Sequence, residues 1–288
     1  MLVATPVKTL ALLALVSAAA HAVVVTYNWN ITYVNTNPDG FMNRRVMGIN
    51  GQFPPPATNV TLNDTLAINV VNQISEPTTL HAHGANFTYT IFIEQYGTYW
   101  IHGHNKGHYV DGLRAPLIIH NPAETYHYDE EYTLAFVDWY HEDHSVLLDD
   151  YLSIFNPTGA EPAPKSALIN QMPNTQFSFV PGKIYRLCII NMSTLAMFHI
   201  HIDGHDMNII VIDGVDVQRT TVKTFPISAA QRYSVLVTTK NITANNFLIH
   251  GDMDPEMFDT VPDTLQMNLT GTIIYDAASP LAPAQMID

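Results

Sequence analysis

The chain has 288 residues, of which 26 are acidic and 12 are basic, so that its formal net charge is −14. This acidic balance argues against nucleic acid as a partner and favours cationic or neutral ones. The length is sufficient for two ordinary domains with substantial cores, and no later stretch reaches the roughly 20 apolar residues that a membrane-spanning helix requires.

The first segment, residues 1–22, is typical of a secretory signal peptide. Lys8 precedes an apolar run, and Ala20-His21-Ala22 provides a small-residue cleavage pattern. We therefore expect a protein that is secreted or held at the cell surface. Seven N-x-[ST] sequons in an exported chain also predict a glycoprotein. They begin at Asn30, Asn59, Asn63, Asn86, Asn191, Asn241 and Asn268.

Beyond residue 22, apolar and polar residues alternate in short runs and helical periodicity is nearly absent. Pro, Asn and Gly separate the runs, which predicts an all-β fold of β-sandwiches. Clear examples are Leu66/Ile68/Val70, Tyr185/Leu187/Ile189 and Tyr233/Val235/Val237. The single cysteine, Cys188, lies in such a run, and we expect it to be a small buried apolar residue.

The sequence divides into a first domain at 23–124 and a second at 125–276. A polar, proline-bearing segment from His120 to Tyr132 spans the boundary, and a loose Ala/Pro tail occupies 277–288. We interpret this tail as a linker to a third domain that the 288 residues do not include.

The two domains repeat one another. In each, a strand ending in Asn (Asn72, Asn191) is followed by a His-x-His pair, and a later strand ends in His-Gly-His or His-Gly-Asp. A long repeat with matched histidines predicts duplicated β-sandwiches. The matched pairs are His81/His83 with His199/His201, and His102/His104 with His250/Asp252.

In a strand, residues i and i+2 face the same side, so each His-x-His pair of the first domain offers two parallel imidazoles. Two such pairs, His81/His83 and His102/His104, predict a metal site. Imidazole nitrogen suits copper, zinc, iron and nickel, and an all-imidazole set in an exported protein favours copper. The sequence contains no His-Glu-x-x-His and no G-x-S-x-G, which argues against a zinc protease and an α/β-hydrolase.

The chain resembles a fungal multicopper oxidase of the iron-transport ferroxidase type, in the laccase-like superfamily. Matching segments run almost from end to end, and "NPTGAEP" and "MDPEMFD" indicate the ferroxidase branch. They include "NPDGFMNRRVMGINGQFPPP", "LHAHG", "YGTYWIHGH", "DGLRAPLIIHNP" and "IDGHDMNIIVIDG". The resemblance implies tandem cupredoxin-like (Greek-key β-sandwich) domains and a copper-dependent oxidoreductase.

By this resemblance, Fe(II) oxidation is coupled to dioxygen reduction, and an iron permease is a partner. His81 would serve a type 2 copper, while His83, His102 and His104 would serve a type 3 pair. These four residues supply half of a trinuclear site, and the 288 residues contain no type 1 copper site. We therefore expect this chain, as written, to be inactive as an oxidase.

Two further features concern the resemblance. Only 18 residues separate His83 from His102, where the family has a few tens more, so we expect part of the first domain to be missing. The resemblance also implies that Glu161 and Asp259 bind substrate iron, because hard anionic oxygens bind iron and stabilise Fe(III). Two surface acids of an acidic protein are the plain alternative.

Two other functions stay open. One is a laccase-type phenol oxidase, and the other is a non-catalytic secreted glycoprotein that binds copper through the histidines of the first domain. Elsewhere we expect His108 to be a solvated loop residue and "HIHIDGH" (His199 to His205) to be structural. "WYHEDHSVLLDDY" (Trp139 to Tyr151) predicts a solvated turn that leads into a short helix.

Overall fold

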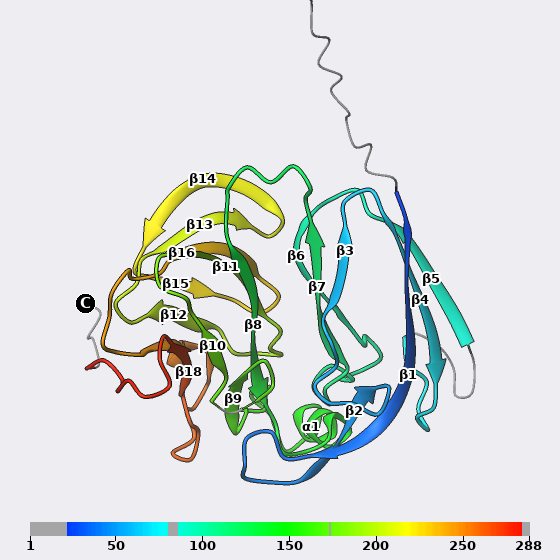
Figure 1. Ribbon diagram of the computed structural model, residues 1–288. Helices are drawn as coiled ribbons and strands as arrows, with labels where there is room; N and C mark the ends of the chain where they lie inside the picture. The colour runs from blue at the N-terminus through cyan, green and yellow to red at the C-terminus, as the bar shows by residue number, and fades with distance from the viewer. Residues whose placement is uncertain (1–21, 80–85, 173, 284–288) are drawn as a thin grey trace, which may run out of the picture.

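The computed structural model describes residues 22–79, 86–172 and 174–283. Most of residues 1–22, the predicted signal peptide, together with His81 and His83, lies outside the described residues. The strands form two groups of sheets that stand side by side, one built from β1 to β7 and the other from β8 to β18 (Figure 1). In the described ranges, no helix is both long enough and apolar enough to cross a membrane.

The first group contains a four-stranded sheet of order β2-β1-β4-β5 and a three-stranded sheet of order β3-β7-β6. The strands are β1 (Val24–Thr36), β2 (Arg44–Ile49), β3 (Thr58–Thr61), β4 (Thr65–Asn72), β5 (Asn86–Phe92), β6 (Gly97–His102) and β7 (Arg114–His120).

The second group contains a six-stranded sheet of order β14-β13-β16-β11-β8-β9 and a five-stranded sheet of order β10-β18-β17-β12-β15. Its strands are β8 (Glu130–Trp139), β9 (Ser166–Ile169), β10 (Gln176–Ser178), β11 (Ile184–Asn191), β12 (Phe198–Ile202), β13 (Met207–Ile212), β14 (Val215–Val222), β15 (Thr224–Ile227), β16 (Arg232–Thr238), β17 (Phe247–Met253) and β18 (Asn268–Ile274). The helix α1 (His144–Tyr151) and the 3-10 turn η1 (Pro255–Met257) lie in its loops.

The alternating pattern predicted from the sequence produces two-faced strands. Along β17, buried and half-buried residues alternate over all seven positions, because successive side chains point to opposite faces. The buried faces of the two sheets of the second group meet in one apolar core, which includes Phe136, Leu187, Ile200 and Ile249. Cys188 is fully buried in β11, as predicted.

The internal repeat is visible in the strand pairing. β1 pairs in parallel with β4, which places Ile31 opposite Asn72, and β8 pairs in parallel with β11, which places Phe136 opposite Asn191. Both asparagines are fully buried and fix the loop that follows them: the side-chain amide of Asn72 donates to Glu76 O (2.9 Å), and that of Asn191 donates to Ala196 O (2.8 Å). Asn191 is therefore a sequon that a glycan could not occupy without disrupting the fold.

A smaller apolar cluster joins the two groups of sheets. Val46 and Ile118 from the first group pack with Val137, Trp139 and other residues of the second. Polar bonds reinforce this contact, since Arg114 on β7 donates from Nη1 to Met192 O (2.7 Å) and from Nη2 to Asp138 O (3.2 Å).

Asp138 is the buried carboxylate that compensates Arg114. Its oxygens accept backbone N–H groups from Thr194 (2.9 Å), Leu195 (2.8 Å) and Ala196 (3.2 Å), and Oδ1 lies 3.9 Å from Arg114 Nη1. The side chains of Arg114 and Asp138 are both fully buried. The carboxylate thus holds the turn after β11 and balances a guanidinium that has no access to water.

We expect Asp138→Ala to lower the free energy of unfolding by about 3–5 kcal/mol, because it leaves a buried cation and several N–H groups without their acceptor. The control is Glu130→Gln, which removes an exposed ion pair to Lys183 (2.8 Å) and should lower the free energy of unfolding far less, because solvent screens the pair. Urea denaturation followed by circular dichroism measures both. Equal losses in the two variants would contradict this account of Asp138.

Candidate metal centre

The sequence-predicted pair His102 and His104 lies where β6 ends. His102 is the last residue of the strand, and the extended chain carries His104 to the same side, so that the two ring centroids are 5.6 Å apart. The His104 amide donates to Thr79 Oγ1 (2.6 Å), and this bond ties the pair to the loop after β4. The spacing allows both imidazoles to reach one metal ion or two adjacent ions.

His102 is held in a defined orientation. Its ring stacks on Trp100 at 4.2 Å between centroids, and its Nδ1 lies 3.3 Å from the carbonyl oxygen of Gly103. A carbonyl only accepts, so Nδ1 carries the proton and Nε2 presents its lone pair as a ligand atom. Burial lowers the pKa of His102 below the ordinary imidazole value, which keeps the ring in the neutral form that binds metals.

This environment fits copper. His102 and His104 are imidazole donors where β6 ends, and among the first-row divalent ions such ligands bind Cu(II) most strongly. His102 and His104 would hold the metal, and bound copper would supply one-electron redox chemistry. Their predicted partners, His81 and His83, lie outside the described residues.

Glu161 and Asp259 are both exposed. Glu161 follows α1 and lines a cavity of about 280 Å³, together with Tyr140 and His144. Asp259 follows η1 on the loop between β17 and β18. Within the described ranges, no hydrogen bond or ion pair involves the side chain of either residue, so the two carboxylates are free to bind a cation but are not joined to each other.

The prediction that His108 is a solvated loop residue is wrong. Its side chain is fully buried, because the loop between β6 and β7 folds back through bonds from His108 N to Asn105 O and from Leu113 N to His108 O, both 3.2 Å. The predicted helix after Trp139 is confirmed as α1, but its first residue, His144, is 4% exposed rather than solvated.

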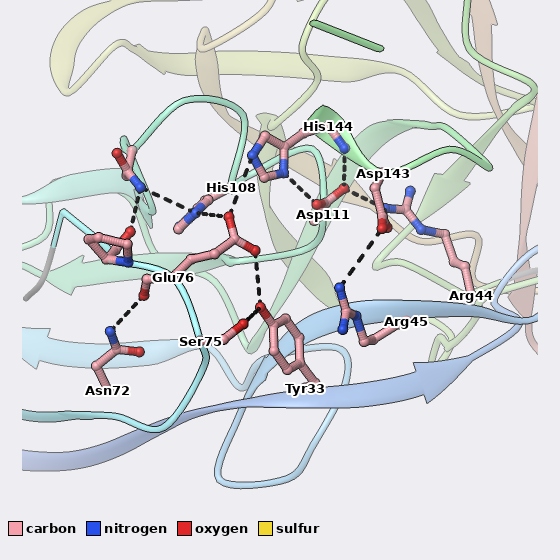
Figure 2. Close-up of polar contacts among 12 residues, drawn as sticks. Tyr33, Arg44, Arg45, Asn72, Ser75, Glu76, His108, Asp111, Asp143 and His144 are labelled. Carbon is pink, nitrogen blue, oxygen red and sulfur yellow. Dashed lines mark hydrogen bonds and ion pairs between the residues drawn. The ribbon is translucent and has the colours of Figure 1, made fainter. Parts of the chain in front are cut away.

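These two histidines belong to a cluster that the sequence reasoning missed. Glu76, His108 and His144, which we call the Glu76 cluster, each offer one donor atom, and the three atoms lie within 4.8 Å of one another. Figure 2 shows both rings directed toward the Glu76 carboxylate. The three residues come from two separate loops and the first position of α1, so no local motif in the sequence could indicate them.

The histidines of the second group of sheets divide into two kinds. His205 has both ring nitrogens engaged, with Asp203 O (2.7 Å) and Tyr275 Oη (2.7 Å), which is the structural role predicted for "IDGH". His201 stacks on His250 at 4.0 Å between centroids, and His250 Nε2 lies 3.3 Å from Asp203 Oδ2. The register places His201 opposite His250 on paired strands.

Known proteins share this architecture. The family profile "Multicopper oxidase" matches residues 130–278, and a second profile with the same description matches residues 30–87 and 82–124. The all-β fold with tandem cupredoxin-like sandwiches is confirmed by a crystal structure of Fet3p, described as a multicopper oxidase that functions in iron import. It superposes with a TM-score of 0.88 at 31% identity, over 92% of this chain and 55% of that one. A laccase from Botrytis aclada superposes with a TM-score of 0.81 at 29% identity and the same coverage.

Similar sequences carry names that refer to iron. The iron multicopper oxidase fer1 of Mycosarcoma maydis is 39% identical over 90% of this chain and 50% of its own length. The iron transport multicopper oxidase fetC of Epichloe festucae is 38% identical over 93% and 47%. FET3 of Saccharomyces cerevisiae, an iron transport multicopper oxidase, is 32% identical over 100% and 48%. The chain thus spans about half the length of the curated relatives it matches.

Proposed function

Because this chain belongs to the multicopper oxidase family, we propose that it carries two cupredoxin domains of a copper-dependent ferroxidase, at 23–124 and 125–276. The observation that carries the proposal is the His102/His104 pair at the end of β6, with ring centroids 5.6 Å apart and with the pKa of His102 lowered by burial, which favours the neutral ring. In this proposal His81 and His83 complete half of a trinuclear copper site. The reaction of the whole protein is oxidation of Fe(II) coupled to reduction of dioxygen.

The second group of sheets supports the pairing of histidine motifs. There, the matched residues His201 and His250 lie on hydrogen-bonded neighbouring strands, with His199 opposite Asp252. The repeat therefore brings its two motifs together in the domain that has exchanged one histidine for Asp252. In the first domain, the corresponding four positions are all histidine, which is the complete set of nitrogen donors.

Iron is favoured over phenols as the substrate by two observations. The relatives at 32–39% identity described above are named for iron or iron transport. Glu161, a hard oxygen donor without a hydrogen-bond partner among the described residues, borders a cavity of about 280 Å³ beside α1. We propose that Glu161 and Asp259 bind the Fe(II) substrate, that an iron permease receives the product, and that the whole protein is exported to the cell surface or beyond.

The first test concerns copper. We expect the 288-residue chain to bind copper, and His102→Ala/His104→Ala to lose at least half of that copper at equal total metal. The copper-loaded parent chain should show no intense blue absorption. Its only thiol, Cys188, is fully buried, and burial raises the pKa of that thiol to about 12. Atomic absorption after desalting measures the stoichiometry. The control is His120→Ala, which removes a half-buried histidine at the end of β7; equal copper in all three proteins would contradict the assignment.

The second test concerns iron. In the whole protein that carries this segment, Glu161→Gln and Asp259→Asn should each raise the KM for Fe(II) by about tenfold, which corresponds to about 1.4 kcal/mol of lost binding. The KM for an aromatic substrate should not change. Oxygen consumption with each substrate measures both, and Glu256→Gln, an exposed acid of the same loop as Asp259, is the control. Equal losses on iron and phenols would favour the laccase function instead.

A further inference from the structure

We propose that the Glu76 cluster is a second metal site of this chain, separate from the His102/His104 pair, and that it binds a divalent transition-metal ion of the zinc class. The ligands are His108 Nε2, His144 Nε2 and Glu76 Oε2. None of the three residues is a predicted copper ligand. The site therefore goes beyond the proposed oxidase function and does not depend on it.

The distances between the donor atoms match those around a metal ion. Glu76 Oε2 lies 3.5 Å from His108 Nε2 and 4.0 Å from His144 Nε2. These separations are long for hydrogen bonds, which favour 2.7–3.2 Å. Donors bound tetrahedrally at about 2.0–2.1 Å stand about 3.3–3.4 Å apart, so small side-chain shifts would close the shell around an ion.

The tautomer of His144 prepares it for a metal. Its Nδ1 lies 2.6 Å from Asp111 Oδ2, and a carboxylate accepts, so the proton on Nδ1 leaves a lone pair on Nε2. Asp111 is itself buried and paired with Arg44, as Figure 2 shows. A carboxylate behind a ligating histidine is the usual arrangement that orients the ring and raises its basicity.

His144 Nε2 has no partner of its own. The residue is 4% exposed, and this nitrogen is buried without a hydrogen bond in the described structure. It points instead toward another acceptor, the Glu76 carboxylate. A cation between these two facing lone pairs would satisfy both, and an unpaired buried polar atom otherwise costs about 1–3 kcal/mol.

The Glu76 carboxylate is also held in place by hydrogen bonds from neighbouring residues. Glu76 Oε1 accepts from Tyr33 Oη at 3.0 Å, which leaves Oε2 for the cluster. The backbone carbonyl of Glu76 accepts from the buried Asn72 amide at 2.9 Å, so the loop that carries it is fixed. His108 is fully buried and packs edge-on against His144, with centroids 5.3 Å apart. All three ligands thus occupy defined places before an ion binds.

The donor set selects the class of ion. Two imidazole nitrogens and one carboxylate oxygen suit zinc and its first-row neighbours, whereas calcium and magnesium require shells of oxygen. Three protein ligands leave a fourth position for water, and a cavity of about 40 Å³, large enough for a water molecule, borders Glu76 and His144. The ion would join Glu76 and His108 of the first group of sheets to the first residue of α1. It would thereby fix a wall of the cavity that Glu161 borders.

The test uses the 288-residue chain and Zn²⁺ alone. We expect Glu76→Gln and His108→Gln each to bind one equivalent of Zn²⁺ fewer than the parent, measured by competition with a chromophoric chelator. The matched controls, Glu94→Gln and His120→Gln, remove an exposed glutamate and a half-buried histidine outside the cluster and should keep the full stoichiometry. Zn²⁺ should raise the melting temperature of the parent by several degrees, and raise that of Glu76→Gln by less.

Zn²⁺ bound at the His102/His104 pair could affect the measured stoichiometry. To remove that contribution, Glu76→Gln is repeated in a His102→Gln/His104→Gln background. The loss of one equivalent should persist there, whether or not the copper assignment is correct. Far-UV circular dichroism without metal checks the fold of each variant. Glu76→Gln is the decisive variant, because glutamine keeps the shape of glutamate and the Glu76 side chain is partly exposed, so the fold should tolerate the change. Full Zn²⁺ stoichiometry in folded Glu76→Gln would overturn the site, as would a loss shared equally by Glu94→Gln.

Discussion

The guanidinium of Arg114 lies between the two groups of sheets, with no exposure of its side chain to solvent. Burial lowers its pKa to about 10, so the group is still charged at neutral pH and must find its compensation inside the protein. It finds that compensation on the far side of the boundary, in the carboxylate of Asp138 and the carbonyl oxygens of Asp138 and Met192. Separating the two groups of sheets would leave this buried charge without its partners. The two groups therefore keep one fixed relative orientation.

The relative orientation of the two groups also positions the histidine-bearing loops. A second arginine, Arg44 on β2, pairs with Asp111, and Asp111 in turn bonds the backbone N–H (3.0 Å) and ring of His144 at the start of α1. The helix of the second group is thereby held against the loop that follows β6. His102, His104 and His108 all lie on or beside that loop. The packing between the groups therefore determines which side chains of the second group reach the histidine-bearing edge of the first.

The two proposed metal sites in this region differ in how they are built. His102 and His104 come from one strand end, and a stacked tryptophan with one carbonyl is sufficient to orient His102. The Glu76 cluster is assembled from a loop after β4, a loop after β6 and the beginning of α1, with Asp111 and Tyr33 behind its ligands. The first is a local product of strand geometry, whereas the second exists only because the two groups of sheets pack together.

The sequence by itself determined the features that depend on local periodicity and on short-range order. Alternation in strands such as β4, β11 and β16 predicted an all-β fold, and the matched Asn72 and Asn191 revealed the repeat that the strand register confirms. The placement of His102 and His104 on one side was also predictable, because residues two positions apart on a strand share a face. Tertiary structure alone decided the burial of His108 and His144 and their convergence with Glu76. Those positions depend on how loops 32 and 36 residues apart along the chain fold over one another, which no local pattern specifies.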